Sequence, residues 1–306
     1  MSSTVAVIGA GTIGRSFAFL FARSGYTVRV FDPRSDLAEV VAGLQADVTA
    51  DASARNELGS QVGAVEVADT VEAAVDGVVF VQESGPEDAE AKPKLFAQFA
   101  EAAPTEAVFA TSSSTIPASL IATALEPEAA ARVIVGHPFN PPHLMPLVEV
   151  VPSPQTSGQT VEATVEFYRS CGREPVVLGR EIRGFVGNRL QNALMKEAIS
   201  LVQNGIVTVD QLDTVMKNSL GLRWAAIGQF EGMHFGGGEA GIRGFMDHIG
   251  PAFAAIEDLP VDLDPAGMED VFEQVEEAYG PTPTPQAAAA RDRIQKAVLE
   301  ARGQGR

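Results

Sequence analysis

The glycine pattern at residues 9–14 constrains this chain more than any other feature of its sequence. The GxGxxG sequence directly follows the apolar run Thr4–Ile8 and opens a helical pattern that ends at a glycine. A second β-branched run, Thr27–Phe31, comes next and ends at Asp32, 18 residues after the last glycine of the pattern. A strand, a glycine turn, a helix and a second strand with a terminal acid are typical of a dinucleotide-binding fold.

Each residue of the turn has its own predicted role. Gly9 permits the tight turn, Gly11 lets the backbone approach a pyrophosphate, and Gly14 lets the helix pack closely on the strand. Thr12 and Ile13 open the helix, whose free N–H groups and dipole favour phosphate charge. The alternative is a glycine turn with a purely structural role.

Asp32 indicates which dinucleotide binds. Its carboxylate can accept hydrogen bonds from the adenosine ribose hydroxyls and would repel a 2′-phosphate, so we predict NAD rather than NADP. Arg34 argues the other way, because an arginine at this place can bind that phosphate. The alternative for Asp32 is an ordinary turn residue after a strand.

Short apolar runs continue through the first 180 residues. They lie at residues 78–82, 107–111, 133–136 and 147–151, with helical patterns between them. Strands this apolar need helices on both faces of the sheet. We therefore predict an α/β fold with a doubly wound, parallel, Rossmann-type sheet.

The pattern changes after Gly184. Apolar residues recur every four positions between Val186 and Val202, which predicts a long helix that ends at Gly205. Helical patterns dominate from there, and residues 287–302 predict a terminal helix. We predict an NAD-binding domain at residues 1–183 and an all-α substrate and dimerisation domain at residues 184–306.

Composition excludes several classes of protein. The chain has 306 residues, which suggests two domains, and 22 basic against 40 acidic residues give a net charge of −18. An acidic chain repels nucleic acids and anionic membranes. The single cysteine, Cys171, excludes an internal disulfide and, with only four histidines, a cysteine-rich zinc site. We expect no metal, no signal peptide, no membrane span and a cytoplasmic location.

A second group of residues carries chemistry. His137 lies at the carboxyl end of an apolar strand, where open α/β sheets place their ligands. Glu149 lies inside the apolar run LVEVV, where a carboxylate is costly without a partner. A carboxylate on one imidazole nitrogen makes the other nitrogen a better base, so the pair could take a hydroxyl proton. The alternatives are a capping histidine and a structural glutamate paired elsewhere.

Four motifs together resemble the L-3-hydroxyacyl-CoA dehydrogenase superfamily. They are the glycine turn with Asp32, TSSSTIPASLI (111–121), GHPFNPPHLMPLVEVV (136–151) and GFVGNRL (184–190). The resemblance implies that His137 is the general base and that Glu149 orients it. It also implies that Ser114 binds the substrate oxygen and that Asn188 completes the site. The alternative for Ser114 and Asn188 is helix capping.

The resemblance implies further cofactor contacts and an assembly. Asn140 matches the asparagine that contacts the cofactor, and Glu87 and Lys92 match NAD contacts of the family. A lysine there can neutralise a cofactor phosphate. The family also implies a homodimer formed through the helical domain.

The acidic segment at residues 33–75 departs from the acyl-CoA enzymes. Those enzymes resemble one another in a lysine-rich helical insertion that holds the CoA nucleotide. Here the segment has two basic residues, Arg34 and Arg55, against eight acidic ones, so it would repel a 3′-phosphate. The runs at 140–157 and 220–253 look closer to the L-gulonate 3-dehydrogenase (λ-crystallin) and L-carnitine dehydrogenase branches.

Those branches imply a substrate without CoA. We expect NAD-dependent oxidation of the hydroxyl β to a free carboxylate, with Arg223 and Arg243 as candidate partners of that carboxylate. The run Gly236–Gly238 is a candidate mobile loop, and the alternative for both arginines is a solvated surface. The alternative functions are an L-3-hydroxyacyl-CoA dehydrogenase without the basic helix and a non-catalytic, crystallin-like NAD-binding protein.

Overall fold

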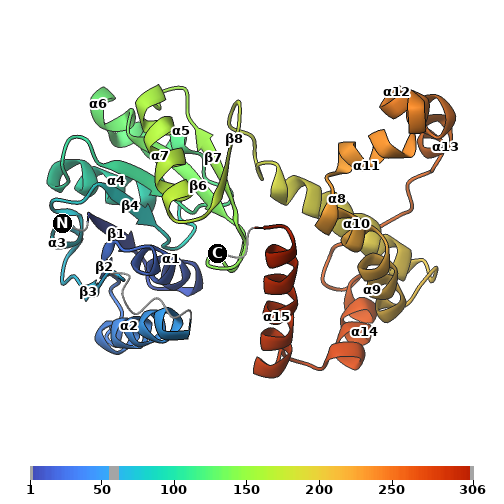
Figure 1. The fold of residues 1–306 in the computed structure, drawn as a ribbon, viewed down its shortest axis with the longest axis horizontal. Coiled ribbons are helices and arrows are strands. Elements are labelled where there is room, and N and C mark those ends of the chain that lie inside the picture. The colour runs from blue at the N-terminus through green and yellow to red at the C-terminus, as the bar shows by residue number, and fades with distance from the viewer. Residues whose placement is uncertain (1–2, 55–61, 304–306) are drawn as a thin grey trace. The chain divides into compact units, whose positions relative to one another are not determined.

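A computed structural model describes residues 3–54 and 62–303, and the chain divides into two compact units (Figure 1). The first unit is Met1–Asn188 and the second is Arg189–Arg306. Arg55 and Glu57, which belong to the acidic segment 33–75, lie outside the described residues. None of the described helices is both long enough and apolar enough to cross a lipid bilayer.

The first unit is built on one sheet, whose strand order in the described residues is β3-β2-β1-β4-β5-β6-β7-β8. Its strands are β1 (Thr4–Ile8), β2 (Thr27–Phe31), β3 (Val65–Val67), β4 (Phe80–Glu83), β5 (Val108–Thr111), β6 (Val133–Pro138), β7 (Leu147–Pro152) and β8 (Glu174–Val177). This order, with helices on both faces, confirms the predicted Rossmann-type α/β fold. The sheet turns back between β1 and β4, which is the topological switch point.

The prediction of a parallel sheet is correct for most strand pairs and wrong for one. β7 pairs with β6 in the antiparallel direction, and β8 then runs parallel to β7. The physical reason is the length of the connection between β6 and β7. Only eight residues separate Pro138 from Leu147, and a parallel crossover needs a dozen or more.

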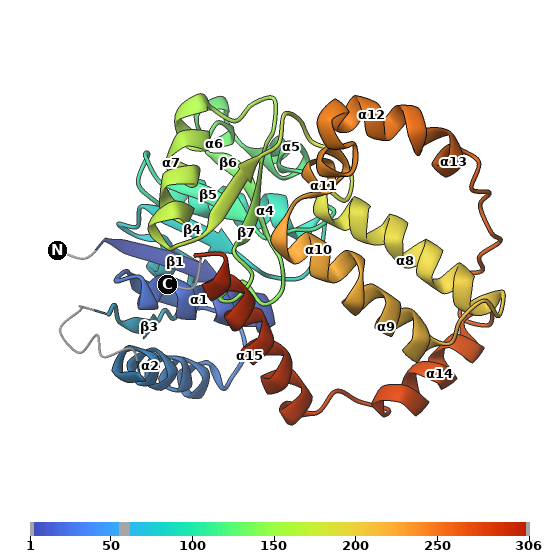
Figure 2. The ribbon, with the colours of Figure 1, turned by 45° about the vertical axis from the view of Figure 1, so that its right-hand side comes forward.

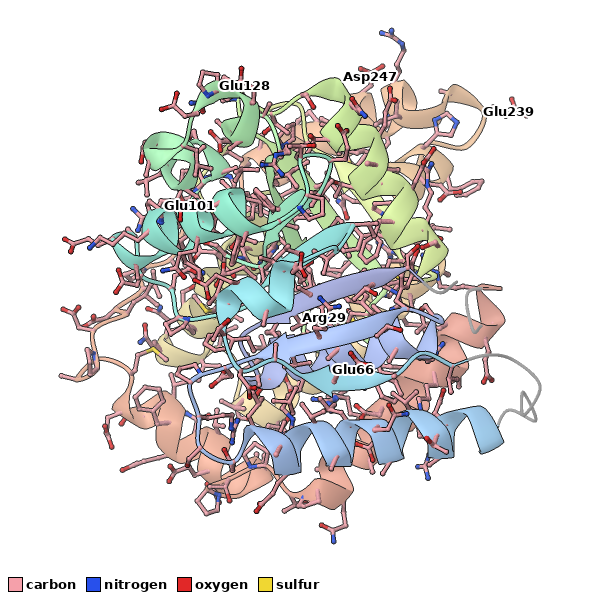
Figure 3. The ribbon with its side chains drawn as sticks, turned by 90° about the vertical axis from the view of Figure 1, so that its left-hand side faces the viewer. Arg29, Glu66, Glu101, Glu128, Glu239 and Asp247 are labelled. Atoms are coloured by element: carbon pink, nitrogen blue, oxygen red, sulfur yellow. The ribbon has the colours of Figure 1, made fainter. Side chains whose placement is uncertain are left out.

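Two edge strands have no counterpart among the predicted runs. β3 has only three residues, and two of them are exposed. β8 contains Pro175, and a proline within a run argues against a strand except at an edge. Figure 3 shows the β3 edge, where Arg29 on β2 is next to Glu66 on β3 in the register. Arg29 donates to the carbonyl of Asp76 at 2.6 Å and so ties the edge to the residue that follows helix α3 (Val71–Val75).

Helices cover both faces of the sheet (Figure 2). They are α1 (Thr12–Arg23), α2 (Leu37–Ala54), α3 (Val71–Val75), α4 (Ala91–Ala102), α5 (Ala118–Ile121), η1 (Ala122–Ala124), α6 (Pro127–Ala130) and α7 (Gly158–Ser170). One core layer joins the sheet to α1, α2 and α7, and contains Phe17, Phe80 and Tyr168. The other joins it to α3, α4 and α5, and contains Phe96 and Phe109.

The second unit is helical, and its described residues contain no strand, as predicted. Its elements are α8 (Gly187–Gln203, which begins in the first unit), α9 (Val209–Asn218), α10 (Leu220–Ala226), α11 (Gln229–Gly236), η2 (Gly238–Ala240), α12 (Gly241–His248), α13 (Gly250–Ala254), α14 (Glu269–Tyr279) and α15 (Pro285–Ala301). A capping box of Thr208 and Gln211 begins α9.

The core of the helical unit is small. Val202, Val209 and Val271 are its buried cluster. The predicted apolar stripe of α8 is buried only at its end, because Leu190 and Leu194 are exposed and Val202 is not. Many other large apolar side chains of this unit are exposed too, including Phe230, Phe235 and Phe253.

Candidate active site

The antiparallel pairing of β6 and β7 sets His137 directly opposite Glu149. The Nδ1 atom of His137 lies 2.9 Å from Oε2 of Glu149, and the two residues are 4% and 2% exposed. The other carboxylate oxygen, Oε1, accepts hydrogen bonds from the backbone N–H groups of Val186 and Gly187, each at 2.9 Å. The glutamate that the sequence left without a certain partner therefore binds both the histidine and the GFVG turn.

These contacts decide the charge and the tautomer of the pair. Burial raises the pKa of Glu149, but hydrogen bonds from His137, Gly187 and Val186 outweigh it and hold the pKa below its ordinary value. Because the carboxylate is ionised, His137 donates from Nδ1. The lone pair of the neutral imidazole is then at Nε2.

Ser114 lies at that second nitrogen. Its hydroxyl is 3.0 Å from Nε2 of His137, so the three residues form a line from carboxylate to imidazole to hydroxyl. Ser114 comes from the loop after β5, and Glu87 holds this loop in place. Glu87 accepts hydrogen bonds from the hydroxyl of Ser113 at 2.7 Å and from the N–H and hydroxyl of Thr115 at 2.8 and 2.7 Å.

Glu87 stays ionised in this position. Partial burial raises the pKa of Glu87. The hydrogen bonds from Ser113 and Thr115 lower it by more than burial raises it, so the pKa of Glu87 is below its ordinary value. The contacts with the serine-rich loop explain why an ionised carboxylate is stable at this position. The contact of Glu87 with NAD stays a prediction.

Asn188 and Asn140 each follow a segment that takes part in this pair. Asn188 follows Gly187, whose N–H binds Glu149, and is half-buried on the first turn of α8. Asn140 is exposed two residues after β6 ends. Phe185 packs on His137, with 5.2 Å between ring centroids, and has a positive φ of 49°. A bulky residue rarely adopts that conformation, so the packed turn must hold it.

The glycine turn has the shape that a dinucleotide needs. Gly9 has a φ of +103°, and a β-carbon on it would lie 2.7 Å from the backbone of Ser84. A β-carbon on Gly14 would overlap the carbonyl of Gly9, whereas one on the exposed Gly11 would meet nothing within 4 Å. Gly11 also has no side chain to cap α1, so Thr12 and Ile13 begin a helix whose first N–H groups are left for a ligand.

Asp32 closes the other side of the turn. Its Oδ2 accepts from the N–H of Ala10 at 2.7 Å and its Oδ1 from the N–H of Arg34 at 3.0 Å. Each oxygen keeps a lone pair for a ribose hydroxyl. Arg34 binds Asp36 through two nitrogens, at 2.5 and 2.8 Å, so its guanidinium already has an acidic partner. The open space at Gly11, the uncapped helix and the fixed carboxylate fit NAD.

The ammonium group of Lys92, which the sequence predicts to neutralise a cofactor phosphate, has an acidic partner inside the protein. This group is buried and donates to both carboxylate oxygens of Glu83, at 2.7 and 2.6 Å. Glu83 also accepts from the hydroxyl of Thr111 at 2.6 Å and the N–H of Gly85 at 2.6 Å. The charge of Lys92 is therefore compensated inside the protein, where it ties α4 to the ends of β4 and β5.

The role of Glu83 was missed in the sequence, although a signal was present. A carboxylate at the end of the apolar run VVFVQE is costly without a partner, the same argument that selected Glu149. The partner of Glu83 could not be predicted from the sequence, because Lys92 is nine residues away and a second lysine, Lys94, is close to it.

Arg223 and Arg243 both lie in the helical unit and are exposed. Arg223 lines a cavity of about 520 Å³ together with Trp224, Phe245 and Phe253. The glycine run at 236–238 is not the loop that the sequence suggested. It ends α11 and leads into η2, and a β-carbon on Gly237 would overlap the backbone of residue 241, so the turn is closely packed.

Two family profiles together match nearly the whole chain. The first, described as 3-hydroxyacyl-CoA dehydrogenase, NAD binding domain, matches residues 4–182. The second, described as 3-hydroxyacyl-CoA dehydrogenase, C-terminal domain, matches residues 184–297. These matches confirm the resemblance that the motifs indicated.

Individual relatives are similar over most of their length. An L-carnitine dehydrogenase of Nocardiopsis dassonvillei is 38% identical, with 97% of this chain and 91% of the relative covered. A 3-hydroxyacyl-CoA dehydrogenase of Gibberella moniliformis is 36% identical, with 98% and 94% covered. The lambda-crystallin homolog of Bos taurus is 40% identical, with 80% and 77% covered.

A solved structure agrees with the fold. The chain is 25% identical to 5-formyl-3-hydroxy-2-methylpyridine 4-carboxylic acid 5-dehydrogenase, which is described as an NAD⁺-dependent dismutase. The TM-score is 0.78. The similarity covers 99% of this chain and 98% of that one.

The buried pair of Lys92 and Glu83 predicts a large loss of stability when one partner is removed. Lys92→Met leaves an uncompensated buried carboxylate, and we expect the free energy of unfolding to fall by about 3 kcal/mol. The exposed Lys94→Met on the same helix is the matched control, with an expected change within about 0.5 kcal/mol. Urea denaturation measures both, and equal losses would contradict the structural role of the pair.

The lowered pKa of Glu149 predicts a pH-dependent contribution to stability. Its ionised form is stabilised in the folded state, so this contribution is present above a pH of about 4.5 and is lost as the pH falls through the folded pKa. We expect the stability gap between wild type and Glu149→Gln to shrink as the pH falls from about 4.5 through the folded pKa of Glu149. Glu162→Gln, at an exposed position on α7, controls for the loss of one negative charge. A gap that stays constant with pH would rule out this assignment.

Proposed function

Because the chain belongs to the 3-hydroxyacyl-CoA dehydrogenase family, we propose that it oxidises a β-hydroxy acid with a free carboxylate. The substrate is of the L-gulonate or carnitine type, and the product is the 3-keto acid. The protein is an NAD-dependent dehydrogenase. The observation that carries the oxidation chemistry is the line of Glu149, His137 and Ser114, with hydrogen bonds of 2.9 and 3.0 Å. The choice of a free acid rests on the acidic charge of α2.

The residues of this line divide the work. Glu149 keeps the proton of His137 on Nδ1, so the lone pair of Nε2 takes the proton of the substrate hydroxyl once the Ser114 hydroxyl turns from Nε2 to the substrate. The positive charge that forms on the imidazole is stabilised by the buried carboxylate. Ser114, at 3.0 Å from Nε2, donates to the substrate oxygen and holds it near the base. Asn188 adds an amide donor from the first turn of α8.

NAD supplies the acceptor for the hydride that leaves carbon 3. Gly9, Gly11, Gly14 and the first turn of α1, with Thr12 and Ile13, bind its diphosphate, and Asp32 binds its adenosine ribose. Glu87 and Asn140 are proposed as further contacts of the cofactor. We place the end of the NAD-binding domain at residue 183 and the helical domain at residues 184–306. The two family profiles, which meet between residues 182 and 184, support this division.

The charge of the segment at 33–75 supports a substrate without CoA. The described part of α2 contributes Glu39, Asp47 and Asp51, and no basic residue stands among its described positions 37–54. A polyanionic nucleotide would meet repulsion along this helix. The names of several relatives, among them the L-carnitine dehydrogenase of Nocardiopsis, support the same substrate class. Arg223 and Arg243 are the proposed partners of the free carboxylate.

A second candidate is an L-3-hydroxyacyl-CoA dehydrogenase, and one observation favours it. The Gibberella relative carries that name at 36% identity over 98% of this chain. The same line of Glu149, His137 and Ser114 would serve both substrates, because the reacting carbon is the same. The two candidates therefore differ only in what binds the rest of the substrate.

The base is tested by removing the imidazole. His137→Ala loses Nε2, and we expect kcat to fall by about 10³-fold or more, whereas the dissociation constant for NAD stays within about twofold. Turnover is followed by NADH absorbance, and NAD affinity by calorimetry. Full activity of His137→Ala would contradict the assignment of the base.

The substrate class is tested with paired substrates. We expect NADH formation with L-gulonate, carnitine or 3-hydroxybutyrate, and at least about tenfold lower kcat/KM with 3-hydroxybutyryl-CoA than with free 3-hydroxybutyrate. Higher kcat/KM with the CoA ester would favour the second candidate. We expect Arg223→Met and Arg243→Met each to raise the KM for the free acid above that of the wild type, because loss of a carboxylate partner weakens substrate binding.

We also propose that the protein is a cytoplasmic homodimer. The exposed apolar side chains of the helical unit, among them Leu190, Phe230 and Phe235, support an interface between two copies. The single buried cysteine suits a reducing compartment. Analytical ultracentrifugation and cell fractionation test the two statements, and a monomer at micromolar concentration or a secreted protein would contradict them.

A further inference from the structure

A second line of polar side chains runs through the core of the first unit, apart from the His137 pair. The hydroxyl of Tyr168 on α7 donates to Oε1 of Gln82 on β4 at 2.6 Å. Nε2 of Gln82 donates to the hydroxyl of Ser112 at 2.8 Å, and that hydroxyl lies 2.8 Å from the hydroxyl of Ser84. Tyr168 and Gln82 are 0% exposed. We call these four residues the Tyr168 relay.

The backbone makes room for the relay at Gly136. This residue precedes His137 on β6, and a β-carbon on it would overlap the hydroxyl of Tyr168. Successive residues of a strand face opposite sides of the sheet. β6 therefore presents His137 on one face and a gap for Tyr168 on the other. A buried polar line that needs a glycine to exist is costly unless all of its groups are bonded.

The direction of the hydrogen bonds follows from the chemistry of the amide. Burial raises the pKa of Tyr168 well above its usual value, so the phenol keeps its hydrogen and must donate it. Its acceptor is the amide oxygen of Gln82, and the amide nitrogen then faces Ser112 and donates to it. The reverse orientation would set the buried phenol hydrogen against an N–H group. Ser112 accepts from Gln82 and can donate its own hydrogen to Ser84, and in that arrangement the hydrogen of the Ser84 hydroxyl points away from the relay.

Ser84 lies at the place where a dinucleotide binds in this fold. It follows β4, which pairs with β1, and these two strands form the switch point of the sheet. Its backbone is the neighbour of Gly9, and its Cβ would be 3.4 Å from a β-carbon on Gly14. The half-buried hydroxyl of Ser84 is thus beside both glycines of the turn.

We propose that the Tyr168 relay holds the hydroxyl of Ser84 as a hydrogen-bond donor to an oxygen of bound NAD. Ser84 is the contact residue. Tyr168, Gln82 and Ser112 are positioning residues, because they act only through the orientation that they give to Ser84. The relay also joins the turns after β4 and β5, which carry Glu87 and Ser114 of the active site.

The test is a double-mutant cycle read by NAD affinity. We expect Ser84→Ala to raise the NAD dissociation constant about fivefold to tenfold, the effect of one lost hydrogen bond. Tyr168→Phe removes one oxygen atom from the far end of the relay and should raise it about threefold or more. The double variant should bind NAD no more weakly than Ser84→Ala, because Tyr168 acts through Ser84. Calorimetry with NAD alone gives these values without any substrate.

Two further variants separate positioning from damage to the core. Thr164→Val removes another fully buried hydroxyl from α7, one that donates to the carbonyl of Thr160, and should leave NAD affinity within about twofold. Ser112→Ala breaks the relay outside the aromatic core and should match Ser84→Ala, even if Tyr168→Phe does not fold. Unchanged affinity in Ser84→Ala, or additive losses in the double variant, would overturn the proposal.

Discussion

The hydrogen bond between His137 and Glu149 is the interaction on which the rest of the site depends. It exists because β7 runs antiparallel to β6, so that the end of one strand meets the beginning of the other. The second oxygen of Glu149 binds the N–H groups at Val186 and Gly187, which fixes the start of α8 against the sheet. One carboxylate thus sets the tautomer of the imidazole and the position of the turn that precedes Asn188.

The cofactor side of the molecule follows a different rule. There the backbone forms most of the binding surface. Gly9 and Gly14 allow the turn to pack closely against the end of β4 and on itself, and Gly11 leaves space open. Buried polar residues then support the turns from behind. The ion pair of Glu83 and Lys92 is one such support, and the Tyr168 relay is another. In both networks the buried charges and amide groups have partners, as a low-dielectric core requires.

Most of the fold could be predicted from the sequence because its signals are local. The glycine turn, the alternation of apolar strands and helices, and the helical pattern after Gly184 all depend on neighbouring residues. The edge strand β3 could not be predicted because three residues are too few to show a pattern. The edge strand β8 could not be predicted because Pro175 interrupts its pattern. The direction of β7 was in principle readable, since its eight-residue connection is too short for a crossover.

The sequence by itself determined the family motifs, the dinucleotide turn with Asp32 and the pairing of His137 with Glu149 as a hypothesis. Only the tertiary structure decided the partners of buried polar groups. Lys92, expected at a phosphate, is bound to Glu83, and Tyr168 reaches Gln82 across 86 positions of sequence through the gap at Gly136. The physical reason is that a buried charge or amide must be satisfied by whatever the packing brings next to it, and packing joins residues that no local pattern connects.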